Sequence, residues 1–252
     1  MQLDIGMVFS SLIGLFLLMG VGWVSVKTKI VPPSASAPMS SLLLKVTLPC
    51  TIFSSLATRE FDSAFLVDGV IIIVIGLFPL YAALSWGISK VLKLPAGRRG
   101  IWSFGATFCN NGFMGFPVAL ALFGEEGLAL AVMFGVPFNL LVYTLGVRMV
   151  CADCGTDAQP VNLVRTLLSN INIALILSLI FYVGQIPLPE ALMTPVTHLS
   201  NVTTPLSMFV TGMALASGKG AELFRDKDAY TATGMRLIVV PLLTWAVMSL
   251  LP

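Results

Sequence analysis

Residues 106–124 read ATFCNNGFMGFPVALALFG, and this stretch decides the fold that we expect. Within eight residues it holds two asparagines, two glycines and a proline: Asn110, Asn111, Gly112, Gly115 and Pro117. In a helix interior, glycine costs about 1 kcal/mol and proline about 3 kcal/mol relative to alanine. Membrane backbone without helical hydrogen bonds must be buried in protein or line a cavity. The stretch predicts a helix broken near mid-membrane, as at transporter substrate sites. A glycine-rich packing face on a continuous helix is the alternative.

The composition of the chain is typical of a membrane protein. Of its 252 residues, 57% are hydrophobic and 10% are charged, with a mean hydropathy of +0.95. Soluble domains carry about 25% charged residues. Membrane helices need about 20 mainly apolar residues, and eight segments meet this requirement: 5–26, 39–57, 64–92, 100–123, 128–150, 170–186, 191–216 and 229–251. We therefore predict an all-α polytopic membrane protein.

The basic residues indicate the orientation of the chain in the membrane. Eleven of the 14 Lys and Arg residues lie in odd-numbered loops or at their edges, and the even-numbered loops hold only Arg59. Because cytoplasmic loops carry the Lys and Arg excess, the N-terminus is expected outside the cell. Lys45 and Arg236 lie within predicted spans near the cytoplasmic side, and we expect both side chains to snorkel to the interface.

A short internal repeat indicates inverted symmetry. The pattern V-T-x-P-x-x-x-F occurs at residues 46–53 and again, 156 positions later, at residues 202–209. Five spans separate the copies, and an odd offset inverts the second copy relative to the first, as in many secondary transporters. We predict a first five-helix repeat at 1–151, a cytoplasmic connecting loop at 152–169, and the first three helices of a second repeat at 170–252. The second repeat is then incomplete, with about eight spans in place of ten.

The broken stretch also resembles a known family. Residues 110–117, continuing into 119–124, resemble the N-x-G-F-x-G-x-P stretch of the auxin efflux carrier family, in its bacterial branch. Leu48-Pro49 with Ile52-Phe53 is similar to the proline motif of the family's second helix, and Pro205 with residues 212–216 is similar to its seventh helix.

The resemblance implies both a fold and a function. The fold has two inverted five-helix repeats whose broken fourth and ninth helices cross near the substrate, forming a scaffold half and a transport half. The function is export or exchange of small organic anions, auxins in plants and dicarboxylates such as malate or malonate in bacteria, across the bacterial inner membrane. The counterpart of the ninth helix is missing here, so the alternative is a transport-inactive fragment or subunit that only associates with other membrane chains.

Asn110 and Asn111 are the first candidate binding residues. Their amides offer hydrogen-bond donors and acceptors without charge. Together with the N–H groups at the start of a half-helix they could bind a carboxylate, and Pro117 suits the first turn of such a half-helix. The alternative is that the amides only hydrogen-bond neighbouring helices.

Hydroxyl side chains beside two prolines are the second group of candidates. They could line the pocket, or they could only satisfy carbonyls that the prolines leave free. Asn139, an isolated polar residue in the fifth predicted span, is a further candidate. The expected substrate-binding residues are Asn110, Asn111, Gly112, Gly115, Pro117, Thr47, Pro49, Thr51, Thr203, Pro205 and Asn139.

Several kinds of chemistry are not expected. His198 is the single histidine, and no Asp or Glu falls clearly in mid-membrane, so we expect neither an enzyme nor a carboxylate Na⁺ site. Cys151 and Cys154 form a lone C-x-x-C, whereas structural zinc needs four ligands. We expect no metal and no cofactor. The expected partners are a small organic anion and the lipid bilayer, not nucleic acid, and a homodimer is left open.

Overall fold

The computed structural model describes residues 5–57, 59–60, 77–95, 97–152, 168–218 and 226–249. These residues form helices and turns without strands. The chain divides into two compact units, which are described separately: residues 1–63, 110–136 and 167–220 form the first, and residues 64–109, 137–166 and 221–252 the second. Most of the predicted third span and of the predicted connecting loop lies outside the described residues.

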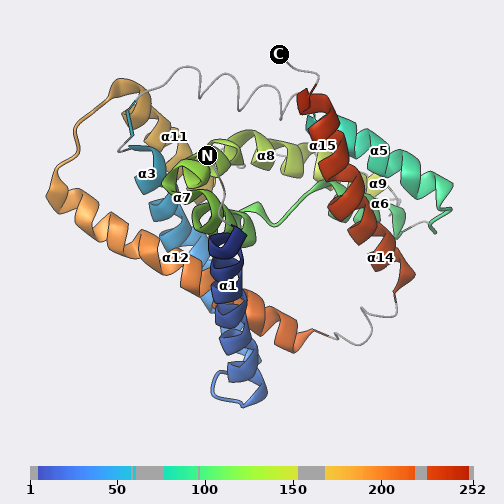
Figure 1. Ribbon diagram of the computed structural model, residues 1–252, viewed down its shortest axis with the longest axis horizontal. Coiled ribbons are helices and arrows are strands. Elements are labelled where there is room, and N and C mark those ends of the chain that lie inside the picture. The colour runs from blue at the N-terminus through green and yellow to red at the C-terminus, as the bar shows by residue number, and fades with distance from the viewer. Residues whose placement is uncertain are drawn as a thin grey trace. The chain divides into compact units, whose positions relative to one another are not determined.

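The first unit is built on the long helix α12, which contacts α1 and α3, while α11 packs on the other side of α3 (Figure 1). Its core is aliphatic and includes Ile52, Leu56, Leu175 and Met208, all nearly inaccessible to solvent. The elements of this unit are α1 (Ile5–Lys27), η1 (Pro33–Ala35), α2 (Ser36–Leu42), η2 (Leu43–Thr47), α3 (Leu48–Ala57), η4 (Asn111–Gly115), α7 (Phe116–Met133), α11 (Asn170–Gly184) and α12 (Glu190–Ser217).

Helices α1 and α12 approach closely because glycine lies at their contact. A Cβ atom placed on Gly22 would overlap the carbonyl oxygen of Phe209, and one on Gly212 would overlap the carbonyl oxygen of Met19. Small residues allow this backbone-to-backbone packing in membranes, where lipid supplies no hydrophobic force between helices. The glycine contacts therefore set the rotation of α12 about its own axis against α1. That rotation also decides which face of α12 lies toward α3.

The second unit contains α5, which contacts α6, and α6 in turn contacts α9 and α14. The start of α6 is tied to α14, because the Arg98 guanidinium pairs with Asp226 at 2.8 Å and with Asp228 at 2.7 Å. The Trp102 indole N–H also donates to the Asp228 carbonyl at 3.0 Å. The elements of this unit are α5 (Phe78–Val91), α6 (Arg99–Thr107), the end of α8 (Gly135–Leu141), η5 (Val142–Gly146), α9 (Val147–Ala152), α14 (Lys227–Gly234), η6 (Met235–Val239) and α15 (Val240–Ser249).

Among the elements that the structure describes, three π-helical turns precede a proline, two in the first unit and one in the second. At the end of η2, η4 and η6, the next N–H donates to a carbonyl five residues earlier, and a proline follows that residue. Proline lacks an N–H and its ring crowds the carbonyl four residues back, so the wider turn gives that carbonyl room. These prolines are Pro49, Pro117 and Pro241. Pro205 instead lies inside the uninterrupted α12, so the two copies of the repeated motif differ in local structure.

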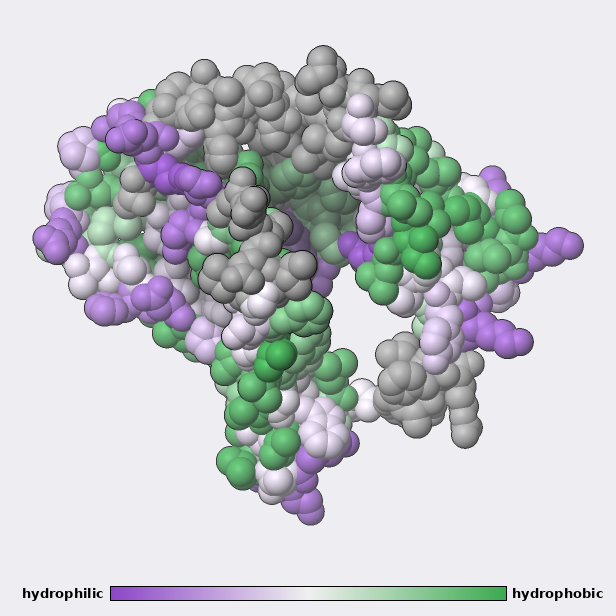
Figure 2. Space-filling model, viewed as in Figure 1, coloured by the Kyte–Doolittle hydropathy of each residue, from purple (hydrophilic) through white to green (hydrophobic). Residues whose placement is uncertain are grey.

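Apolar helices confirm the class of protein. Among the described residues, four helical stretches are long and apolar enough to cross a membrane: Phe9–Lys27, Pro33–Ala57, Arg99–Met133 and Lys227–Val247. Apolar side chains cover much of α1 and α15 (Figure 2), with Phe16 61% exposed and Trp245 72% exposed. Large exposed apolar surfaces of this kind suit contact with lipid. The chain is an all-helical integral membrane protein.

The finer predictions about the fold are not tested by these observations. The count of eight spans, the inverted repeat at 1–151 and 170–252, and the crossing of broken helices stay predictions. One boundary differs from the expectation: α7 continues to Met133 through a kink at Gly124 (φ 66°, ψ −159°), where the sequence predicted a loop between two spans. Glycine tolerates this positive φ without steric strain.

Candidate functional site

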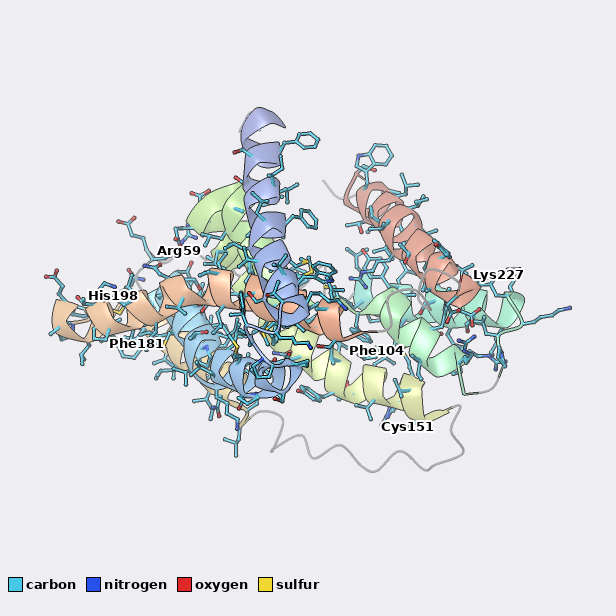
Figure 3. All side chains as sticks on the ribbon, turned by 90° about the horizontal axis from the view of Figure 1, so that it is seen from below. Arg59, Phe104, Cys151, Phe181, His198 and Lys227 are labelled. Atoms are coloured by element: carbon cyan, nitrogen blue, oxygen red, sulfur yellow. The ribbon has the colours of Figure 1, made fainter. Side chains whose placement is uncertain are left out.

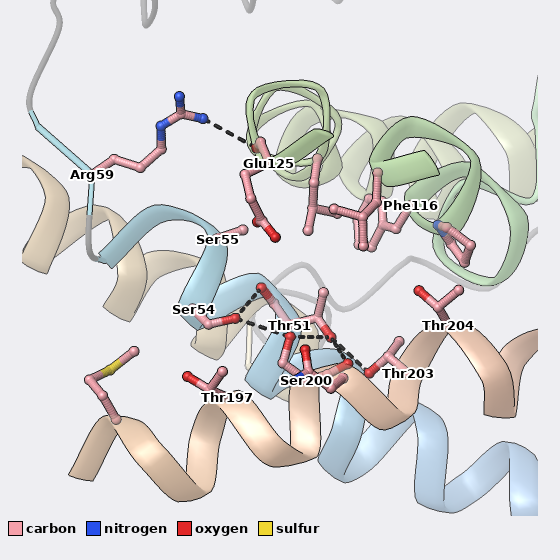
Figure 4. A pocket seen from close by; sticks show the side chains of 15 residues that line it. Thr51, Ser54, Ser55, Arg59, Phe116, Glu125, Thr197, Ser200, Thr203 and Thr204 are labelled. Carbon is pink, nitrogen blue, oxygen red and sulfur yellow. Dashed lines mark hydrogen bonds between the residues drawn. The ribbon is translucent and has the colours of Figure 1, made fainter. Parts of the chain in front are cut away.

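A cavity of about 480 Å³ lies in the first unit, lined by residues of α3, α7 and α12 (Figure 4). Helices α3 and α12 supply a neutral polar side: Thr51, Ser54, Ser55, Thr197, Ser200, Asn201, Thr203 and Thr204. An apolar side comes mainly from α7: Phe116, Pro117, Leu120, Leu128 and Met193 of α12. Arg59 and Glu125 complete the lining with one positive and one negative charge. Ligand pockets typically combine an apolar wall with a few placed polar groups.

A network of four hydroxyls joins α3 to α12 at the cavity. Thr51 Oγ1 donates to Thr203 Oγ1 at 2.7 Å, Ser54 Oγ donates to Ser200 Oγ at 3.1 Å, and Ser200 Oγ lies 3.3 Å from Thr51 Oγ1. Thr51 and Thr203 are buried. Each hydroxyl has one proton and two acceptor lone pairs. The bonds within the network use the protons of Thr51, Ser54 and Ser200, so the Thr203 proton is the one that the network leaves for a ligand in the cavity.

The predicted residues near the two prolines therefore separate into two groups. Thr51 and Thr203 meet directly in the cavity. Thr47 is buried behind them: its carbonyl oxygen lies 3.1 Å from Thr51 Oγ1 and is an alternative acceptor for the one Thr51 hydroxyl proton, and its own hydroxyl has no partner among the described residues. Pro49 and Pro205 are not among the residues that line the cavity.

The predicted asparagines lie where the helix is interrupted. α6 ends at Thr107, Phe108 is extended (φ −101°, ψ 141°), and η4 begins at Asn111. Asn110 caps η4, because its Oδ1 accepts from the N–H of Phe113 at 3.2 Å. The Asn110 side chain is exposed and does not line the cavity. Substrate binding by Asn110 and Asn111 stays a prediction.

The glycines of this turn make room for neighbouring atoms. A Cβ on Gly115 would lie 2.8 Å from Asn111 Oδ1, and one on Gly112 would lie 3.4 Å from a methyl carbon of Leu48. Pro117 follows in the first turn of α7 and lines the cavity, whereas Gly112 and Gly115 do not. Asn139 is half-buried in α8 and belongs to the second unit, so it is not part of this cavity.

Arg236, which we expected to snorkel to the interface, has hydrogen-bond acceptors within the second unit. Its guanidinium donates to the carbonyls of Phe108 at 2.7 Å and Gly105 at 3.2 Å, at the C-terminal end of α6. The last carbonyls of a helix lack partners within it and carry partial negative charge, so a cation binds there favourably. The Phe108 ring packs against Phe104 and Phe138, with centroids 5.3 and 5.9 Å away. Arg236 and this packing together hold the end of α6.

Four functional candidates were missed from the sequence: Ser54, Ser200, Arg59 and Glu125. The two serines could have been found, because Thr51 and Ser54 have the same three-residue spacing as Ser200 and Thr203, which places each pair on one helix face. Arg59 and Glu125 were assigned to loops, and no local pattern indicated that they line a cavity. Within the described chain, no group of three or more His, Cys, Asp or Glu residues could hold a metal ion; His198 lies exposed on α12 (Figure 3).

Comparison with known proteins identifies the family. Residues 7–252 match the family model described as membrane transport protein. An uncharacterized transporter of Methanothermobacter thermautotrophicus is 26% identical over 212 residues, which cover 82% of this chain and 67% of that protein. An uncharacterized transporter of Methanocaldococcus jannaschii is 28% identical over 207 residues, covering 79% and 66% respectively. The chain thus spans about two thirds of the length of these relatives. It belongs to the membrane transport protein family, which is the auxin efflux carrier family that its motifs resemble.

Proposed function

We propose that this membrane transport protein moves small organic anions, such as mono- or dicarboxylates, by efflux or exchange. We place the bound anion in the cavity between α3, α7 and α12. The observation that carries the proposal is the hydroxyl network of Thr51, Ser54, Ser200 and Thr203 on one wall of that cavity. The Thr203 hydroxyl proton, which no bond within the network uses, can donate to a carboxylate without a fixed opposite charge, and the apolar α7 wall suits the carbon skeleton of an organic acid.

The interruption before η4 extends this proposed site. Asn110 and Asn111 stand directly ahead of η4 and α7, and α7 supplies Phe116 and Pro117 to the cavity wall. Because Asn110 uses its Oδ1 for capping, its two amide N–H groups remain available to donate to a substrate. The positive end of the following helix adds to this preference for an anion. We therefore include the two asparagines as a second contact region for the substrate.

The orientation and the inverted-repeat fold are part of the same proposal. Each compact unit takes segments from both predicted repeats, which agrees with a scaffold half and a transport half. We place the N-terminus outside a bacterial inner membrane. Cysteines introduced at Arg98 and Lys227 should then resist an impermeant thiol reagent added to whole cells, and strong labelling at either position would refute this orientation.

Binding and flux of malate test the function. The purified 252-residue chain should bind radiolabelled malate, and liposomes containing it should take malate up. Thr51→Val and Thr203→Val should each weaken binding roughly 3- to 30-fold, since 1.4 kcal/mol is about tenfold. Thr211→Val is the matched control, because Thr211 also lies on α12 but its hydroxyl donates to the Ser207 carbonyl at 2.7 Å, away from the cavity lining.

Flux and binding separate the two functions that the sequence left open. Because the chain spans about two thirds of its relatives' length, transport by the whole protein is itself part of the proposal. Malate binding without flux would favour a subunit that acts by associating with other membrane chains. Equal affinity in wild type, Thr51→Val and Thr203→Val would remove the cavity from the proposal.

A further inference from the structure

Glu125 is an ionisable side chain in the cavity that no part of the proposed function uses. Figure 4 shows its carboxylate pointing from α7 toward Ser55 and Thr51 of α3. The kink at Gly124 immediately precedes it and redirects the chain at this point. Among the described residues, the Glu125 carboxylate has neither an ion-pair partner nor a side-chain hydrogen bond.

Arg59, the cationic side chain in the cavity lining, contacts the main chain of Glu125 and the side chain of Glu126. Arg59 Nη1 donates to the main-chain carbonyl of Glu125 at 3.3 Å, and Arg59 Nη2 lies 4.0 Å from the carboxylate of Glu126. From α11, Gln185 Nε2 donates to the Arg59 carbonyl at 3.0 Å and so holds its backbone. Figure 4 shows the Arg59 guanidinium reaching the Glu125 backbone and not its carboxylate.

The other elements around the cavity turn neutral side chains toward Glu125. Helix α3 contributes only threonine and serine to the lining, and α12 contributes hydroxyls, Asn201 and Met193. His198 of α12 is exposed and does not line the cavity. An anion that enters therefore meets the exposed Glu125 carboxylate as well as the Arg59 guanidinium, and the rest of the cavity lining is uncharged. Two close carboxylates repel each other, and a proton on either one removes that repulsion.

We propose that Glu125 is a proton-binding residue and that the anion is bound together with one proton. This rests on the proposed function, because it requires the anion to occupy the cavity. The proton comes from water and adds to the Glu125 carboxylate, so no covalent bond of the substrate changes. Protonated Glu125 loses its charge and gains an O–H donor for the bound anion. Coupling is reciprocal, so anion binding must take up a proton to the same extent that acid strengthens anion binding.

The pH dependence of malate affinity tests this coupling. The purified 252-residue chain is titrated with malate in Na⁺-free buffer between pH 6 and 8, where both malate carboxyls stay largely ionised. The wild-type Kd for malate should rise by about 3- to 10-fold for each unit of increasing pH. Uptake of one whole proton per bound malate gives the upper limit of about tenfold. A pH indicator in weak buffer should record uptake of up to one proton per malate bound.

Three variants at neighbouring positions assign the effect. Glu125→Gln should bind malate with a Kd that changes less than twofold between pH 6 and 8, and its binding should take up no proton. Glu125→Asp should keep the wild-type dependence of Kd on pH. Glu126→Gln is the matched control, because Glu126 is the next residue, carries the same group, is 74% exposed and is not in the cavity lining. It should retain the wild-type slope.

The failures of the two proposals look different. A wild-type slope that persists in Glu125→Gln, or a flat wild-type profile, would overturn the proton site and leave anion binding intact. Malate affinity that appears only when Na⁺ is added would also overturn it. Absence of malate binding by the wild-type chain would overturn the proposed function and the proton site with it.

Discussion

The Asn110 side chain can be tested for two roles at once, because the structure separates its two polar atoms. Its Oδ1 accepts from the N–H of Phe113 at 3.2 Å and caps η4, while its amide nitrogen is the atom that could donate to a substrate carboxylate. Asn110→Ala removes both groups. Asn110→Ser and Asn110→Asp keep an oxygen that can cap, and Asn110→Asp also places a negative charge where the carboxylate would bind.

The two roles predict different magnitudes. Loss of an N-cap costs about 0.5–2 kcal/mol in stability, whereas Asn, Asp and Ser are nearly equivalent caps. Since the Asn110 side chain is exposed, we expect the lower half of this range for Asn110→Ala. Polar contacts within membranes contribute about 0.6–2 kcal/mol, and 1.4 kcal/mol is about tenfold in affinity. We therefore expect roughly 3- to 30-fold weaker malate binding for Asn110→Ala and Asn110→Ser, with a larger loss for Asn110→Asp.

Melting temperature and malate affinity measured on the same purified variants distinguish these outcomes. If Asn110 both caps and binds, Asn110→Ser should melt like the wild type and bind more weakly. A variant set in which stability falls only for Asn110→Ala while all three bind malate with wild-type affinity would refute binding by Asn110. Unchanged stability in Asn110→Ala would refute the capping role.

Three further predictions follow from particular contacts. Arg236→Met should lower the unfolding free energy by about 2 kcal/mol, and with it the melting temperature, because hydrogen bonds to charged groups contribute about 1.5–3 kcal/mol each and this side chain is only half-buried. Arg236→Lys should recover part of the loss, and equal melting temperatures for all three forms would contradict the contact. Gly212→Ala should destabilise the protein by about 1–3 kcal/mol or more, as overpacking does, while Gly14→Ala on α1, with open space around its Cβ, should be neutral in the same melt. Malate flux should persist when Na⁺ is replaced by choline, and its loss would show a Na⁺ requirement that the proton site does not explain.

The sequence alone determined the class of protein and much of its local structure. Mean hydropathy and the lengths of apolar segments depend on each segment separately, so they indicated an all-helical membrane protein without knowledge of packing. The Asn-Gly-Pro cluster predicted a helix broken near mid-membrane; that break stays a prediction, while α6 ends at Thr107 and η4 begins at Asn111. Its motifs also identified the family that the comparison confirms.

Only the tertiary structure decided which distant groups meet. Thr51 and Thr203 are 152 positions apart, and they bond because glycine contacts fix α12 against α1 and thereby select the face that α12 turns toward α3. Hydropathy gives the depth of a residue but not the direction of its side chain, so Arg236 was expected at the interface although it binds the end of α6. Glu125 was assigned to a loop for the same reason, whereas it follows the kink at Gly124 within α7 and lines the cavity. Helix position follows from the local free energy of transfer, but the contacts of a site follow from packing between helices, which no single segment encodes.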